Sequence, residues 1–201
     1  LVDQQALSDF RNRALTPERP VARGMAENPE TFFAHRESCN PFYEAVPEVV
    51  EEYMNEISRI TGRKYGLFNY YGDPEADRVI ILMGSATEAA REAIDYLREE
   101  KGEKGGLVSV HLYRPFSVKH LLAAVPKTAK RIAVLDRTKE PGANGEPLYL
   151  DVKEAYYGLE NAPLIVGGRY GLSSKDVGPA QMLAVFENLN LEGPKNGFTV
   201  G

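Results

Sequence analysis

Four short apolar runs, each followed by a helix-like stretch, constrain the fold of this chain more than any other feature. The runs are RVIILMG at residues 78–84, GLVSVHLY at 106–113, RIAVL at 131–135 and PLIVGG at 163–168. A strand that is apolar at every position is buried on both faces, and its alternation with helices is typical of a parallel sheet. With GLFNYYG at 66–72 as a further candidate strand, the pattern predicts an α/β fold. We expect three layers, α/β/α, around a mainly parallel sheet of four to five strands.

Proline-rich sequence separates this α/β region from the residues that precede it. Residues 1–45 are predicted to be helical pieces joined by extended sequence, forming a connecting segment from a preceding domain. Residues 46–190 form the α/β domain, with Pro47 at the first position of its first helix. Residues 191–201 are predicted to be a linker to a next domain. Neither end has the character of a natural terminus, so we expect a piece of a longer polypeptide.

The composition excludes several classes of function. An apolar fraction of 43%, a charged fraction of 26% and a net charge of −5 indicate a globular protein without nucleic acid or an anionic membrane as its main partner. No apolar run approaches the roughly 20 residues that a membrane span needs. The single cysteine, Cys39, excludes an internal disulfide and any cysteine-rich cluster built by this chain alone. A cytoplasmic location fits these features.

Arginines stand at the carboxyl ends of three of the four apolar runs, where ligands meet open parallel sheets. These residues are Arg114, Arg137 and Arg169. Arginine suits planar, bidentate binding of carboxylate or phosphate, so one interpretation is an anion pocket. The other interpretation is that the arginines pair with acidic residues of a neighbouring domain or subunit. The residues alone leave both interpretations open.

Other motifs are weaker. The stretch from Asp136 to Pro147 has the outline of a phosphate site: a strand end, a charged pair, a Gly/Pro-rich loop and a helix start. A dinucleotide site needs three spaced glycines, but only Gly84 follows the strand at 78–84, so that interpretation fails. Ser85-x-x-Glu88 matches a capping box and predicts that Ser85 caps the helix that follows. We predict no metal-ligating residues.

Several phrases along the whole chain, in order, resemble the pyruvate:ferredoxin (flavodoxin) oxidoreductases. The phrases are NPETFFAHRESCNPFYEAVPEVVEEYM, YGLFNYYGDPEADRVIILMGSATEAA, VHLYRPFS, VLDRTKEPGANGEPLYLDV and VGGRYGLSSKDVGPAQ. The resemblance implies the end of the first domain followed by a second domain similar to the C-terminal domain of transketolase. It also implies a large homodimeric enzyme that oxidises pyruvate to acetyl-coenzyme A and passes electrons to ferredoxin or flavodoxin. Such enzymes use thiamine pyrophosphate, Mg and [4Fe-4S] clusters.

The resemblance implies a structural and domain-interface role for this segment, because the family's cofactors are held mainly by other domains. No residue here is carried over as catalytic or cofactor-binding, and the Gly-rich loop is expected to serve structure and domain contacts. Two alternatives remain: a segment of an oxidoreductase for another 2-oxoacid, and a free-standing anion- or phosphate-binding module that uses the three arginines. Met25, Glu27 and Glu30 depart from the family's expected pattern, which leaves the contacts of that connecting loop undetermined.

Overall fold

The computed structural model describes residues 2–21, 24 and 26–201, and it divides into two compact units, Leu1–Pro41 and Phe42–Gly201. The described residues of the first unit include two complete helices, α1 (Gln4–Asn12) and α2 (Pro29–Ser38), and neither helix buries any of its residues. Helices this short are marginal in water without tertiary packing. Neither of these two helices therefore contributes a buried core.

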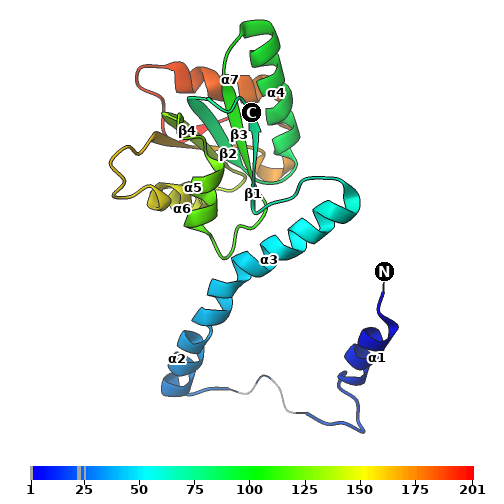
Figure 1. Ribbon diagram of the computed structural model, residues 1–201. Coiled ribbons are helices and arrows are strands. Elements are labelled where there is room, and N and C mark those ends of the chain that lie inside the picture. Colours follow the sequence, from blue (N-terminus) through cyan, green and yellow to red (C-terminus); the bar gives the residue numbers. More distant parts are fainter. Residues whose placement is uncertain (1, 22–23, 25) are drawn as a thin grey trace. The chain divides into compact units, whose positions relative to one another are not determined.

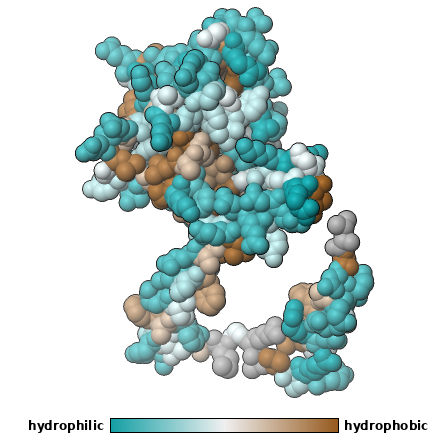
Figure 2. Space-filling model, in the orientation of Figure 1, coloured by the Kyte–Doolittle hydropathy of each residue, from teal (hydrophilic) through white to brown (hydrophobic). Residues whose placement is uncertain are grey.

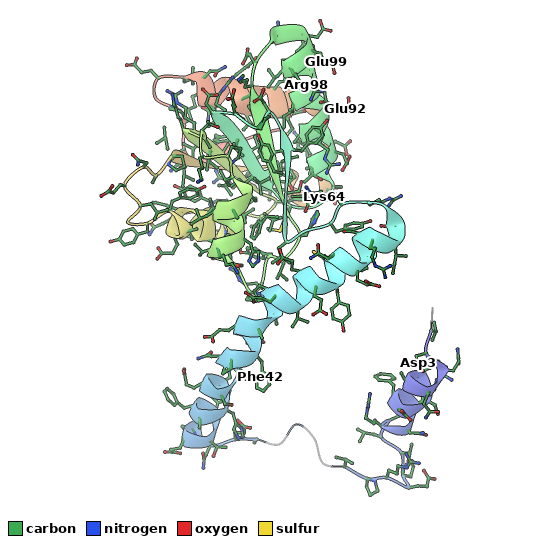
Figure 3. All side chains as sticks on the ribbon, viewed as in Figure 1. Asp3, Phe42, Lys64, Glu92, Arg98 and Glu99 are labelled. Carbon is green, nitrogen blue, oxygen red and sulfur yellow. The ribbon has the colours of Figure 1, made fainter. Side chains whose placement is uncertain are left out.

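Side-chain caps define the starts of both helices in the first unit. The Asp3 carboxylate accepts hydrogen bonds from the backbone N–H groups of Gln5 and Ala6 at 2.9 and 3.1 Å (Figure 3). The Asn28 side chain accepts one from the N–H of Thr31 at 2.9 Å. Such caps satisfy donors that the first helical turn leaves without partners.

Two of the three residues that depart from the family's pattern are described. Glu27 Oε1 lies 2.6 Å from His35 Nδ1, and Glu30 lies in the first turn of α2. An acidic residue in that position is favourable near the positive end of the helix dipole. Met25 lies outside the described residues.

The first helix of the second unit does not begin at the proline that was expected to start it. Helix α3 spans Asn40–Thr61 without a break, with Pro47 buried inside it. Proline inside a helix removes one hydrogen bond, but it does not end α3. Val50 and Met54 of this helix, one and two turns after Pro47, pack against the core. The prediction that Pro47 occupies the first helical position is therefore wrong.

The second unit contains one six-stranded sheet with the strand order β1-β3-β2-β4-β5-β6. Its strands are β1 (Phe68–Gly72), β2 (Arg78–Leu82), β3 (Gly105–Val110), β4 (Arg131–Asp136), β5 (Leu164–Arg169) and β6 (Phe198–Thr199). Strand β1 is antiparallel to β3, and every other pairing is parallel. The mainly parallel α/β prediction is confirmed.

Helices cover both faces of the sheet. They are α4 (Ala86–Lys101), α5 (Val118–Ala124), α6 (Pro147–Ala155) and α7 (Pro179–Asn190). In β2, Ile80 and Leu82 belong to one core cluster together with residues of α4 and α7. Val79 and Ile81 belong to a second cluster together with residues of α5 and α6, so each face has its own core (Figure 1). This arrangement explains why all five residues of β2 are buried.

Polar residues cover the outer sides of the layers. Glu92, Arg98 and Glu99 lie on the side of α4 that faces away from the sheet (Figure 3). The face seen in Figure 2 is mostly hydrophilic, with hydrophobic patches between the polar side chains. The division into an apolar interior and a polar outside is the one expected for helices that cover a sheet.

The sheet has one strand more than the four to five expected, because the chain returns to the sheet near its end. Gly168 pairs with Phe198 and Arg169 with Thr199, which adds β6 beside β5. The pairing places part of residues 191–201 in the sheet. The role of this stretch as a linker, and the expected domain boundaries, stay predictions.

Candidate functional site

The strand order creates a switch point between β2 and β4. The strand that follows β2 in the chain, β3, lies on one side of it, and the next strand, β4, lies on the other. The connections on either side of such a point run over opposite faces of the sheet, which leaves a crevice at the carboxyl ends of the strands. Ligands of open α/β sheets bind at this place, so it is the candidate site.

A cavity of about 320 Å³ lies at this switch point. Residues after β2, β3, β4 and β5 line it, and they are Met83, Gly84, Ser85, Tyr113, Asp136, Arg137, Thr138, Pro147 and Tyr170. A second pocket of about 160 Å³ shares Ser85, Arg137 and Tyr170 with the first and is also lined by Lys175 and Asp176. The shared residues make Arg137 the cation between the two spaces.

Arg137 and Tyr170 are each held by one hydrogen bond to a neighbouring loop. Arg137 Nε donates to the carbonyl oxygen of Gly171 at 2.9 Å, and the Tyr170 hydroxyl donates to that of Met83 at 3.1 Å. Burial raises the pKa of Tyr170, so its hydroxyl stays protonated at neutral pH. The wall of the cavity therefore combines a positioned cation with a neutral phenol.

The start of α4, also at the cavity, differs from the expected capping box. Ser85 has helical backbone angles, φ −64° and ψ −23°, and within the described structure its side chain makes no capping hydrogen bond. A side-chain cap requires an extended N-cap residue, and the residue with unusual angles is Gly84, with φ +82°. Thr87 Oγ1 instead donates to the carbonyl oxygen of Gly84 at 2.8 Å. The prediction that Ser85 caps α4 is wrong.

The buried carboxylate at the end of β4 accepts hydrogen bonds from the helix that follows the Gly-rich loop. Asp136 accepts hydrogen bonds from the N–H groups of Leu148 and Tyr149 at 2.9 and 3.1 Å. Burial raises the pKa of Asp136, and the two N–H donors oppose that shift only in part. Asp136 thus caps α6 from a distance, and these two amides are not available to a phosphate.

A second buried carboxylate closes the same loop. Glu146 Oε2 accepts from the N–H of Glu140 at 3.0 Å, and its Oε1 accepts from Arg169 Nη1 at 2.9 Å. Burial alone would raise the pKa of Glu146, but the Glu140 N–H, Arg169 and Lys139 outweigh it and lower the pKa. These contacts support the expectation that the Gly-rich loop serves structure.

Arg114 is also engaged within its own domain. Its guanidinium lies 3.9 Å from the centre of the Tyr113 ring and 2.8 Å from Asp151 Oδ2 on α6. Burial, helped by the Asp151 carboxylate, raises the pKa of Tyr113 to about 12. The acidic partner of Arg114 is therefore already present in this chain.

The three arginines do not form one shared pocket. Arg114 pairs with Asp151, and Arg169 pairs with Glu146 and donates to the carbonyl oxygen of Gly197 at 2.7 Å. Of the three, only Arg137 lines the cavity. Sequence reasoning missed Tyr113 and Tyr170 as lining residues, although each is adjacent to one of the predicted arginines.

Two further features concern the residues that the structure describes: groups that could bind a metal ion and helices that could span a membrane. In the residues that the structure describes, no group of three or more His, Cys, Asp or Glu side chains is placed to hold a metal ion. Over the same part of the chain, every helix is too short or too polar to cross a membrane.

The sequence was compared with known protein families and curated proteins. Residues 76–182 match the family described as "Pyruvate:ferredoxin oxidoreductase core domain II". The whole chain is 57% identical to the pyruvate-flavodoxin oxidoreductase of Klebsiella pneumoniae and 55% identical to that of Enterobacter agglomerans. It is 53% identical to the pyruvate:ferredoxin oxidoreductase of Moorella thermoacetica.

The chain covers only a small share of these relatives. It aligns over all of its 201 residues but spans 17% of the length of each. Among solved structures, the 2-oxoglutarate:ferredoxin oxidoreductase of Magnetococcus marinus matches with a TM-score of 0.47 and 19% identity. That match covers 86% of this chain and 27% of the other chain.

Proposed function

Because the chain belongs to the pyruvate:ferredoxin oxidoreductase core domain II family, we propose that it is the second-domain segment of an enzyme that oxidises pyruvate to acetyl-coenzyme A. The observation that carries the proposal is the match over all 201 residues to pyruvate oxidoreductases at more than 50% identity. The electron acceptor in this proposal is ferredoxin or flavodoxin, and the full-length enzyme is a cytoplasmic homodimer.

Within that enzyme, we propose a structural and domain-interface role for this segment. The chain contains one cysteine, whereas a [4Fe-4S] cluster takes four thiolates, so these residues do not fit as a cluster site. Both oxygens of Asp136, the buried carboxylate at the cavity, are already occupied by backbone N–H groups. Thiamine pyrophosphate, Mg and the clusters are accordingly assigned to other parts of the polypeptide.

The three arginines receive different roles in this proposal. Arg114 and Arg169 make contacts within their own domain, since each pairs with an acidic residue of this chain. Arg137 is the residue that meets an anionic group or an acidic side chain of a neighbouring domain. It lines both spaces at the switch point, and among the described residues its guanidinium is engaged through Nε alone.

The proposed activity is tested with the full-length polypeptide that contains this chain. Purified protein supplied with pyruvate and coenzyme A should reduce flavodoxin or ferredoxin and form acetyl-coenzyme A. 2-Oxoglutarate in place of pyruvate separates the alternative of another 2-oxoacid. Strong activity with 2-oxoglutarate and none with pyruvate would reverse the substrate assignment while leaving the family intact.

The role of Arg137 is tested in the same protein by comparing Arg137→Ala with Arg137→Lys. Loss of activity or of domain assembly in the Ala variant, with partial recovery in the Lys variant, supports an anionic partner. Arg114→Ala is the matched control, because that side chain is exposed and already paired. Equal behaviour of all three variants would show that Arg137 meets no such partner.

A further inference from the structure

Helix α3 carries an exposed row of large apolar side chains, which we name the α3 stripe. It consists of Phe42, Val49, Tyr53, Ile57 and Ile60. The exposed fraction of these side chains ranges from 48% for Val49 and Ile57 to 77% for Phe42, which is labelled in Figure 3. At the helical rise of 1.5 Å per residue, the stripe is about 27 Å long.

The α3 stripe is distinct from the side of the helix that packs on its own domain. Pro47 is buried, and Val50 and Met54 pack against the core beneath the sheet. Ser58 Oγ, on that side, accepts a hydrogen bond from the N–H of Tyr65 at 2.9 Å. Since 3.6 residues make one turn, the stripe positions recur on a neighbouring side of α3. Helix α3 therefore packs on its own domain through other residues, and the stripe is additional apolar surface.

Acidic residues accompany the stripe. Glu48 lies 3.7 Å from Lys119, and Glu51 lies 3.6 Å from His120, so these two carboxylates face α5 of the same domain. Glu52 and Glu56, four residues apart, follow the other edge of the stripe, where Glu56 is already paired with Arg59 at 2.5 Å. A partner surface that fits this edge is apolar in its centre and carries one lysine or arginine opposite Glu52.

We infer that the α3 stripe is covered by a segment of the same polypeptide that lies outside these 201 residues, with an apolar centre and a basic residue opposite Glu52. The inference rests on the proposed function, because it requires the longer enzyme. The relatives devote 83% of their length to other sequence, so a covalently tethered partner is at hand at high effective concentration. Continuous apolar surface of this kind marks an interaction site, and permanent interfaces are more apolar than transient redox contacts.

The partner is identified by photo-cross-linking in the full-length protein. Tyr53→p-benzoylphenylalanine replaces one aromatic side chain with another on the stripe, and the same replacement at Asn55 provides a control on a different, exposed side of α3. After illumination, protease digestion and mass spectrometry identify the cross-linked peptide. We expect the probe at position 53 to cross-link to a peptide from outside the 201 residues within the same molecule. The probe at position 55 should not give that product.

Each other outcome overturns the inference. A product twice the size of the protein on a denaturing gel would mean that a second copy covers the stripe. A cross-link to flavodoxin, or only to residues within this chain, would also contradict it, as would no protein cross-link at all. The measurement needs no substrate, so a protein that fails to oxidise pyruvate can still give the expected cross-link. A failure of the proposed activity is therefore distinguishable from a failure of this inference.

Discussion

Two buried carboxylates at the ends of one loop have pKa values that are shifted in opposite directions. Among the described residues, Asp136 receives two backbone N–H groups and no cation in hydrogen-bonding contact, and burial raises its pKa. Glu146 receives a backbone N–H and Arg169, with Lys139 nearby, and its pKa is lowered. The Glu140 N–H, Arg169 and Lys139 together favour the charged form of Glu146, whereas the two N–H groups at Asp136 do not overcome the effect of burial.

Glu146→Gln should destabilise the protein by about 1.5–3 kcal/mol at pH 7, because it weakens hydrogen bonds to a charged, buried group. The folded-state pKa of Glu146 is lowered, so its contribution is complete above the unfolded value of about 4.3 and is lost as pH falls through the folded value. The difference between wild type and variant should therefore shrink below about pH 4. Urea unfolding at several pH values measures it.

Asp136→Asn provides the contrast in that measurement. The folded-state pKa of Asp136 is raised, so acid favours the folded state through this group between its unfolded and folded values. Removing it should make the loss of stability in acid steeper than in wild type. A Glu146→Gln difference that stays constant down to pH 3 would show that the Arg169 pair does not set the pKa of this carboxyl.

Ser85→Ala should change the free energy of unfolding by less than about 0.5 kcal/mol, the range of surface substitutions that break no cap. The reason is the helical backbone of Ser85 and the missing capping bond. Thr87→Ala is the matched variant, because it removes the hydrogen bond to Gly84 and should cost about 1 kcal/mol. A larger loss at Ser85 than at Thr87 in urea titrations would restore the capping interpretation.

Among the elements, the short strand β6 depends on a glycine opposite it. A Cβ atom on Gly168 would lie 2.5 Å from the ring of Phe198 and 2.8 Å from a methyl carbon of Leu135. The flat backbone of β5 at this position lets the phenyl ring lie against the strand. Because position 168 has no side chain, it leaves room for the phenyl ring of Phe198 beside β5.

Gly168→Ala should destabilise the second unit by about 1–3 kcal/mol, the usual range for overpacking, and should loosen β6. Gly193→Ala is the control, because no atom lies within 4 Å of the added methyl group. The control should be neutral or slightly more stable. Thermal unfolding of the two variants measures the difference, and equal melting temperatures would mean that Phe198 moves aside without cost.

The elements that could be predicted are those whose burial is evident from the sequence of one segment alone. Apart from their charged end residues, the runs at β2 and β4 are apolar at every position because helices cover both faces, so the sequence of each run suffices. The start of α3 could not be read from Pro47, because packing of Val50 and Met54 overrides the local preference. The pairing of β6 depends on Gly168, thirty residues earlier, and no local pattern contains that information.

At the candidate site, too, some features could be predicted from the sequence and others could not. The position of Arg137 at the carboxyl edge follows from its place directly after β4. The partners of the other two arginines come from α6 and from the residue before it, Asp151 and Glu146, and such pairings form only in the folded chain. The position of the arginines at the carboxyl edge of the sheet was therefore predictable. That Arg137 alone of the three lines the cavity was not.

At the scale of the whole molecule, the isolated 201-residue chain should not oxidise pyruvate. One cysteine cannot supply the ligands of a [4Fe-4S] cluster, so electrons have no acceptor within this segment. Reduction of a viologen dye with pyruvate, coenzyme A and thiamine pyrophosphate should stay at the level of buffer, while the full-length protein provides the positive control. Pyruvate-dependent reduction by the pure segment would contradict the proposed role.

The position of β2 sets how its amide hydrogens exchange with solvent. All five of its residues are buried, and it is paired on both sides, with β3 and β4. Its amides can exchange only when the whole sheet opens, whereas the two-residue β6 can fray alone. Deuterium uptake at β2 should therefore report the global free energy of unfolding, and uptake at β6 a much smaller local one. One native-state exchange experiment would thus rank the strands of this sheet by the free energy at which each one opens.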